Sequence, residues 1–142
     1  MNRGSGLGAV FFDTHGLLAV MNTRDEHHQL AVATVERLVQ AKTPVWTSDW
    51  VLTEFLSFGL RRQIRRAAIE TVLDLQVSRA TTIIPAARRT WESAFRLFQS
   101  RPDKSWSLVD CTTIALCRER GINRVFTHDH HFAQAGLEIL LP

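Results

Sequence analysis

The sequence has little of several residue types and patterns that would mark a specialised class of protein. It contains only two cysteines, Cys111 and Cys117, and both lie in a segment with the pattern of a single helix. Helical geometry holds the two side chains too far apart for a disulfide between them, so we interpret them as buried thiols in a reducing cytosol. No apolar run is long enough for a membrane helix. Asp13 and His15 interrupt the apolar stretch near the N-terminus, which argues against a signal peptide.

Lysine is also scarce, because only Lys42 and Lys104 are lysines among seventeen basic residues and the others are arginines. Arginine makes planar, two-point contacts with phosphate, and the net charge is +3. A nucleic-acid partner is therefore one interpretation of the composition, and an ordinary solvated surface is the other. The densest basic run, residues 60–66, suits a phosphate track, a partner surface or a solvated helix junction.

Repeats, low-complexity tracts and linkers are absent from the sequence, so residues 1–142 are predicted to form a single domain. Short apolar runs typical of strands alternate with amphipathic segments typical of helices. The expected strands are residues 9–12, 44–47, 81–85, 124–127 and 138–141, and the expected helices are residues 25–41, 48–60, 65–77, 86–100 and 107–120. We expect Leu60 on the apolar side of the second helix and Phe95 and Phe98 on that of the fourth, and Pro85 and Gly121 mark the ends of a strand and a helix. Strands that are apolar on both faces indicate a parallel sheet covered on both sides, which is a doubly wound α/β fold.

Four acidic residues follow the expected strands or begin an expected helix. They are Asp13, Glu54, Asp110 and Asp129. Ligands of doubly wound folds bind beyond the carboxyl ends of the strands, so we expect these side chains to converge there. Converging carboxylates raise one another's pKa unless a cation lies among them, and all-oxygen ligands favour Mg²⁺ or Mn²⁺. Such an ion lowers the pKa of a bound water and stabilises charge on a phosphate.

Each acid also has an ordinary structural explanation. Asp13 is placed to cap a helix that follows it, and Glu54 suits a solvated helix position. Ser107 and Asp110 have the spacing of a capping box. The case for a metal site therefore depends on the four acids as a set. Ten acidic residues remain outside this set against seventeen basic ones, so a basic surface surrounds the predicted acidic pocket.

Four segments, in order and spanning nearly the whole chain, resemble the PIN-domain ribonucleases and most of all the VapC toxins of bacterial toxin–antitoxin pairs. The segments are V-F-F-D-T at 10–14, S-D-W-V-L-T-E at 48–54, D-K-S-W-S-L-V-D-C at 103–111 and F-T-H-D-H-H-F at 126–132. The resemblance implies a three-layer α/β/α sandwich with a central parallel sheet of four to five strands. It also implies a cytoplasmic Mg²⁺-dependent endoribonuclease that forms a homodimer and is inhibited by a small antitoxin, whose C-terminal segment covers the site.

The same resemblance implies roles for individual residues. Asp13 and Asp110 would hold the metal, while Glu54 and Asp129 would act through water or bind a second ion. Hydroxyl groups of neighbouring residues, Thr14 and Ser107, would orient the carboxylates. The expected reaction is attack of a metal-activated water on an RNA phosphodiester, in tRNA, rRNA or mRNA, leaving a 5′-phosphate and a 3′-hydroxyl.

Three other functions are compatible with parts of the pattern. A non-catalytic interaction module would keep the acids only as helix caps, and the complete set of four argues against it. A metal-dependent DNA nuclease would use the same chemistry. A phosphoacceptor receiver domain would need an acidic pair after the first strand and a lysine after the last long strand, and neither Asp13 alone nor Lys42 and Lys104 meet that need.

Three histidines surround Asp129, at positions 128, 130 and 131, and this clustering at first suggests a transition-metal site. The place of Asp129 after a strand favours instead a fourth carboxylate of the acidic pocket. We expect His131 to pack at the start of the next turn or to approach a phosphate, and we assign no role to His128 and His130.

Overall fold

The computed structural model describes residues 8–142, in which five strands form one parallel sheet with the order β3-β2-β1-β4-β5. The strands are β1 (Val10–Phe12), β2 (Val45–Ser48), β3 (Thr81–Ile84), β4 (Arg124–Phe126) and β5 (Glu138–Ile139). The chain runs outward from β1 first to one side and then to the other, so the strand order reverses between β1 and β4. This reversal creates the crevice in which doubly wound folds bind ligands.

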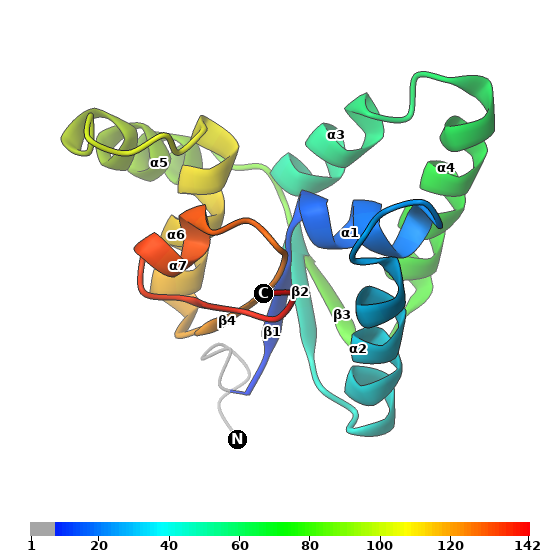
Figure 1. The fold of residues 1–142 in the computed structure, drawn as a ribbon. Helices are drawn as coiled ribbons and strands as arrows, with labels where there is room; N and C mark the ends of the chain where they lie inside the picture. The colour runs from blue at the N-terminus through cyan, green and yellow to red at the C-terminus, as the bar shows by residue number, and fades with distance from the viewer. Residues whose placement is uncertain (1–7) are drawn as a thin grey trace.

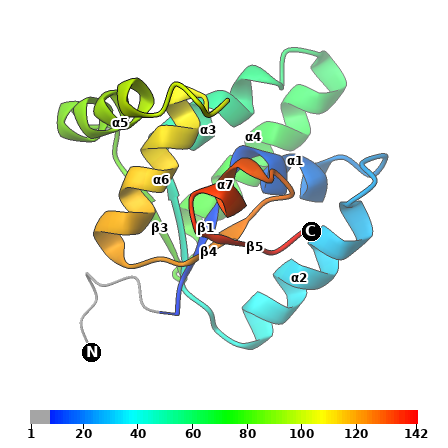
Figure 2. The same cartoon turned by 60° about the vertical axis from the view of Figure 1, so that its left-hand side comes forward.

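Helices cover both faces of the sheet, which confirms the predicted three-layer architecture. They are α1 (Thr14–Met21), α2 (His28–Gln40), α3 (Asp49–Ser57), α4 (Arg62–Val77), α5 (Arg88–Ser100), α6 (Leu108–Arg120) and α7 (His131–Gln134). Figure 1 shows α1, α2 and α4 on one side of the sheet and α5, α6 and α7 on the other, and Figure 2 shows α6 and α7 from a second direction. Helix α3 packs against α1, α4 and α6.

The core lies at the two central strands. All residues of β1 are buried, and the rings of Phe12 and Phe126 pack across the β1–β4 pair with centroids 4.5 Å apart. Cys111 and Cys117 are both free and buried, as predicted, and burial raises the pKa of the Cys117 thiol to about 12. No helix in the described part of the chain is long and apolar enough to span a bilayer.

Helix α1 was considered only as the helix that Asp13 would cap and was not among the expected helices, because its sequence T-H-G-L-L-A-V-M shows no alternation between an apolar and a polar face. The structure explains this pattern. Gly16, Leu17 and Ala19 are buried, and the neighbouring Leu18 and Val20 are half-buried, so nearly the whole circumference of the helix is covered. Helix α7 was also not expected, since it has only four residues.

Three expected helical segments are longer than the helices that the structure shows, and the first of them, 25–41, corresponds to α2 (His28–Gln40). The segment 48–60 ends as a helix at Ser57, and Leu60, which we expected on its apolar side, is 77 % exposed. The chain turns at Gly59, where an added Cβ would lie 3.2 Å from the Cβ of Ala68, so the backbone approaches α4 closely there. The segment 86–100 begins as a helix at Arg88. Its Phe95 and Phe98, also expected on the apolar side, are 40 % and 47 % exposed.

Candidate metal and catalytic centre

The ends of the two central strands bring Asp13 and Thr127 together. Phe12 and Phe126 are partners in the β1–β4 register, so the residues that follow them leave the sheet side by side. The hydroxyl of Thr127 donates a hydrogen bond of 2.8 Å to Oδ2 of Asp13, and both side chains are fully or nearly fully buried. This pair lies at the point where the strand order reverses, where sequence analysis placed the ligand site.

Gly16 permits the close approach of α1 to the end of β4. A Cβ at this position would overlap the carbonyl oxygen and the ring of Phe126. Asp13 begins this helix as its N-cap, and its carboxylate accepts a 3.2 Å hydrogen bond from the backbone N–H of His15. The helix therefore fixes the carboxylate of Asp13 beside β4, and the capping role of Asp13 coexists with its place at the crevice.

Asp110 enters the crevice from the first turn of α6. Its backbone N–H donates to the hydroxyl of Ser107, and its Oδ2 accepts from the backbone N–H of Ser107, both at 3.0 Å. These reciprocal bonds form the predicted capping box. The indole N–H of Trp106 donates to the carbonyl of His131 at 3.1 Å, which ties the start of α6 to α7.

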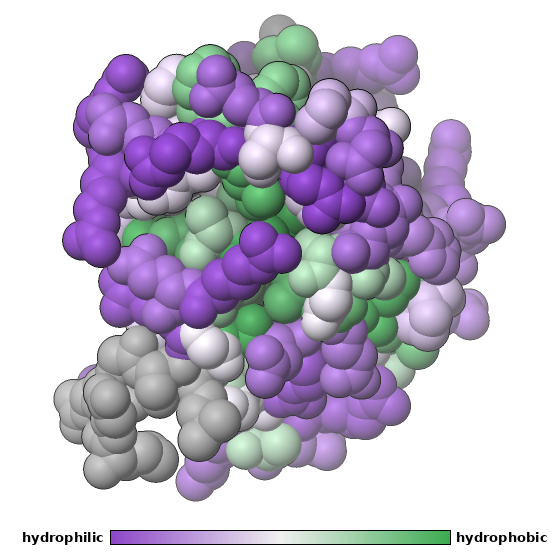
Figure 3. Space-filling model, turned by 90° about the vertical axis from the view of Figure 1, so that its left-hand side faces the viewer, coloured by the Kyte–Doolittle hydropathy of each residue, from purple (hydrophilic) through white to green (hydrophobic). Residues whose placement is uncertain are grey.

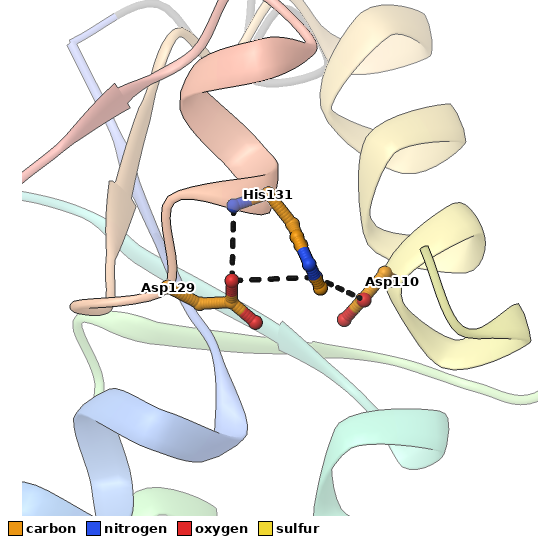
Figure 4. Close-up of side chains that lie close together, drawn as sticks. All are labelled: Asp110, Asp129 and His131. Carbon is orange, nitrogen blue, oxygen red and sulfur yellow. Dashed lines mark hydrogen bonds and ion pairs between the residues drawn. The ribbon is translucent and has the colours of Figure 1, made fainter. Parts of the chain in front are cut away.

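His131 lies between Asp110 and Asp129 (Figure 4). Its Nδ1 is 3.4 Å from Oδ2 of Asp110 and 3.3 Å from Oδ1 of Asp129, and its backbone N–H donates to Oδ1 of Asp129 at 2.9 Å. One potential ligand atom from each of the three residues lies within 4.8 Å of the others. From the sequence, His131 was expected only to pack or to face a phosphate. A histidine two residues after an aspartate has no distinctive pattern, so its contact with Asp110 could not be predicted.

Asp110 is mostly buried, and this burial, together with the nearby Asp13 and Asp129, raises the pKa of its carboxyl. Burial likewise raises the pKa of Glu54 on α3, and Asp13 and Asp110 raise it further, while the neighbouring Thr14 opposes the rise. Asp110 thus lies close enough to interact electrostatically with each of the other three acids. A cation among them would remove the repulsion that these shifts reflect.

His15 is a member of this cluster that sequence analysis did not select. Its Nδ1 lies 3.2 Å from Oδ2 of Asp13 and 3.8 Å from Oδ2 of Asp129. The hydrogen bond to Asp13 outweighs partial burial and raises the pKa of His15 to about 9. Its place in the first turn after Asp13 was the available signal, but a histidine two residues after an N-cap has no distinctive pattern.

The histidines near Asp129 do not form a common three-histidine site. The ring of His128 stacks on His27, with centroids 4.4 Å apart, and meets His15 edge-on at 5.1 Å. Burial and the nearby His15 and His27 lower the pKa of His128. His130 is exposed at the N-cap of α7, so only His131 contacts both Asp110 and Asp129.

The donor set suits a divalent ion. Oδ1 of Asp13 is buried and has no hydrogen-bond partner among residues 8–142, and a buried anionic oxygen requires a cation or a donor. Carboxylate oxygens are the ligands that Mg²⁺ and Mn²⁺ prefer. The potential ligand atoms that lie within 4.8 Å of one another belong to Asp110, Asp129 and His131. Oδ2 of Asp13 is instead in hydrogen-bond contact with Thr127 and His15. The assignment of Asp13 and Asp110 as the metal ligands stays a prediction.

The model of the PIN-domain family matches residues 10–137 of the chain. VapC20 of Mycobacterium tuberculosis, a 23S rRNA-specific endonuclease, is 29 % identical over 134 residues, which are 94 % of this chain and 98 % of that protein. The crystal structure of VapC20, a toxin that cleaves the sarcin–ricin loop, has a TM-score of 0.78 and 28 % identity, covering 91 % of this chain and 96 % of that one. FitAcB from Neisseria gonorrhoeae shares the fold, with a TM-score of 0.66 at 14 % identity over 92 % of this chain and 95 % of that one.

Proposed function

Because the chain belongs to the PIN-domain family, we propose that it is a single-domain, metal-dependent endoribonuclease and the toxin of a toxin–antitoxin pair. The observation that carries this proposal is the convergence of Asp13, Asp110 and Asp129, with Glu54 nearby, at the carboxyl edge of the sheet. Gathering these carboxylates in one place destabilises the apo protein, and a bound cation would offset that cost.

In the proposed site Asp13 and Asp110 hold Mg²⁺ or Mn²⁺, and Glu54 and Asp129 act through water or at a second ion. When bound, the ion supplies a water of lowered pKa and neutralises charge on the phosphate. The chain itself supplies orientation. Thr127 holds the carboxylate of Asp13, and the capping box with Ser107 holds that of Asp110.

Proton transfer is the second contribution of the chain's own residues. Glu54 is half-buried, and burial raises the pKa of its carboxyl, so its carboxylate is a stronger base than an exposed glutamate. We propose that a Glu54 oxygen accepts the proton of the attacking water. Attack of this water on phosphorus breaks the P–O3′ bond, the leaving 3′-oxygen takes a proton from solvent, and the products are a 5′-phosphate and a 3′-hydroxyl.

The relatives suggest the substrate and the partners. VapC20 is named for cleavage of 23S rRNA, so ribosomal RNA is the first substrate to test, followed by tRNA and mRNA. The proposed RNA substrate places the protein in the cytoplasm. We also propose that the protein forms a homodimer, which sedimentation of the purified chain tests. A cognate antitoxin would cover the acidic pocket with its C-terminal segment.

The decisive experiment compares three purified proteins on ribosomal RNA with Mg²⁺, mapping the cleaved ends by sequencing. We expect the wild type to cut at defined sites and chelation by EDTA to stop the reaction. The variant Asp110→Asn should be inactive, while Asp74→Asn, which alters an exposed acid at the other end of the molecule, should cut like the wild type.

Other outcomes would replace the proposal. Metal-dependent cleavage of DNA in preference to RNA would indicate a DNA nuclease, and full RNA cleavage in EDTA would remove the metal from the mechanism. Expression of the chain in bacteria, with and without its neighbouring reading frame, tests the toxin role. Growth arrest that the neighbour does not relieve would argue against a toxin–antitoxin pair.

A further inference from the structure

A cavity of about 480 Å³ lies where the C-terminal end of α5 meets the loop before α6. Its volume is in the range of small-molecule binding sites. Aromatic side chains line it from two directions, with Phe95 and Phe98 on α5 and Trp106 on the loop. Arg101 and Lys104 also line it. On this side of the molecule, apolar side chains form a recessed area between hydrophilic ridges (Figure 3).

The cavity is connected to the acidic pocket through two residues. Trp106, which forms part of its wall, donates a hydrogen bond to the carbonyl of His131. Cys111, another wall residue, directly follows Asp110 in α6. The wall of the cavity and the acidic pocket therefore meet at the start of α6.

The exposed face of α5 carries a row of flat groups. The rings of Trp91 and Phe95 stack with centroids 5.1 Å apart, and the guanidinium of Arg88 lies 4.3 Å from the Trp91 ring. Phe95 and Phe98 expose 40 % and 47 % of their surface, although both are large apolar side chains. Exposed aromatic groups beside arginines are the usual platform for unpaired bases, because every base can stack on a ring or a guanidinium plane.

The charge of this region suits a polyanion. Residues 88–104 contain five basic and two acidic residues, a balance of +3 that equals the net charge of the whole chain. Asp103 binds Arg101 through two bonds of 3.0 and 2.9 Å and holds its guanidinium 5.3 Å from the ring of Trp106. Lys104 makes no ion pair with any residue of the described range 8–142.

A second cavity, of about 470 Å³ between α2 and α4, lacks these features. Its walls are mainly aliphatic, as at Val35 and Leu75, and its one lysine, Lys42, shares the rim with Asp74. The two lysines of the chain thus lie one at each cavity, which provides a matched control.

We propose that the cavity at the end of α5 binds an unpaired base of the RNA substrate, stacked on Phe95 and Phe98, with Lys104 against a neighbouring phosphate. The inference rests on the proposed function and deepens it, because it assigns the single-stranded part of the substrate to a particular surface. An RNA loop satisfies this requirement, since its bases are already unstacked.

The test measures the affinity of a short fluorescent oligoadenylate by anisotropy, in an Asp110→Asn background that prevents cleavage. We expect Phe98→Leu to weaken binding about tenfold, since leucine keeps an apolar side chain but has no ring on which a base can stack. Phe98→Trp should bind at least as tightly as the parent. Phe95→Leu, with circular dichroism as the folding check, repeats the test if Phe98→Leu does not fold.

The phosphate contact is tested through the salt dependence of the same affinity. Lys104→Gln should lower the slope of log affinity against log salt by about 0.7, the value for one phosphate contact to a single strand. Lys42→Gln should leave the slope unchanged.

Three results would overturn the inference. Equal affinity of Phe98→Leu and parent would remove the stacking contact, and equal affinity for an abasic ribose phosphate chain would leave only backbone binding. Loss of a dimer in Phe98→Leu, with RNA affinity per protomer unchanged, would identify this face as an interface between copies. Cleavage by Asp110→Asn itself would instead contradict the proposed function, whatever the base contact.

Discussion

The two ends of the parallel sheet carry different kinds of side chain. At the carboxyl edge, polar groups are buried together, with Asp13, Asp110 and Thr127 inside and His15 and His131 beside them. Toward the amino edge, one face of the sheet borders a cavity of about 470 Å³ that is lined largely by aliphatic side chains of α1, α2 and α4, by the first residues of β2 and β3, and by Phe12 of β1.

This difference places stabilising aliphatic burial and the carboxylates of the proposed site at different ends of the sheet. Aliphatic walls gain free energy on burial and need no partners, so the amino edge requires only volume and shape. Buried carboxylates lose hydration and repel one another, which the raised pKa values of Asp110 and Glu54 record. A fold that keeps such groups at one edge and aliphatic groups at the other therefore concentrates its chemistry at the carboxyl edge.

The largest expected effect comes from Asp13→Asn. Asparagine caps helices about as well as aspartate and keeps an oxygen that can accept from Thr127, so the fold should remain. The loss of one anionic ligand should slow RNA cleavage about 1,000-fold or more, which corresponds to about 4 kcal/mol of transition-state stabilisation. Cleavage rates at saturating RNA, beside circular dichroism spectra, measure both properties. If folded Asp13→Asn cleaved RNA at the wild-type rate, Asp13 would be only a helix cap.

Much of the contrast between the two edges could be predicted from the sequence. All five strands and five of the helices were located, because their apolar runs and the stops at Pro85 and Gly121 are local signals. The capping box at Ser107 and Asp110 was also predicted from spacing alone and is present. The parallel order followed from strands that are apolar on both faces.

The features that sequence did not predict depend on contacts between distant segments. The covered helix α1 lacks a polar face, and the glycine that allows its approach, Gly16, is recognisable only beside Phe126. The bond from Thr127 to Asp13 joins residues 114 positions apart. Exposure of Phe95 and Phe98 was likewise missed, because a helical pattern indicates which residues share a face but not whether that face is covered.

A truncation at the amino edge should have the second largest effect, and only on stability. Leu38 is buried in the wall of the aliphatic cavity, and Leu38→Ala removes buried methyl groups there. We expect a loss of about 3 kcal/mol in the free energy of unfolding, with the cleavage rate per folded molecule unchanged. Urea denaturation gives the first quantity, and a cleavage assay well below the transition gives the second. A lower cleavage rate under conditions in which Leu38→Ala is still fully folded would show that the two edges are coupled.

Divalent metal should stabilise the protein through the carboxyl edge alone. An ion that binds only the folded state, at 100 times its dissociation constant, raises the free energy of unfolding by about 2.7 kcal/mol. We expect Mg²⁺ or Mn²⁺ to raise the melting temperature of the wild type and of Leu38→Ala by the same amount. The double variant Asp13→Asn, Asp110→Asn should show no shift. An equal shift in the double variant would place the ion elsewhere on the molecule.

The smallest effect is expected for Ser107→Ala, which separates the two roles of the capping box. The variant removes the hydroxyl that accepts from the N–H of Asp110, but the N–H of residue 107 can still donate to the carboxylate of Asp110. Loss of such a cap costs about 1 kcal/mol, or a few degrees in melting temperature, while Ser107→Thr should restore most of it. RNA cleavage should change less than about threefold, because the carboxylate keeps its backbone donor. A loss of activity comparable to that of Asp110→Asn, at an unchanged melting temperature, would instead make Ser107 a positioning residue of the carboxyl edge.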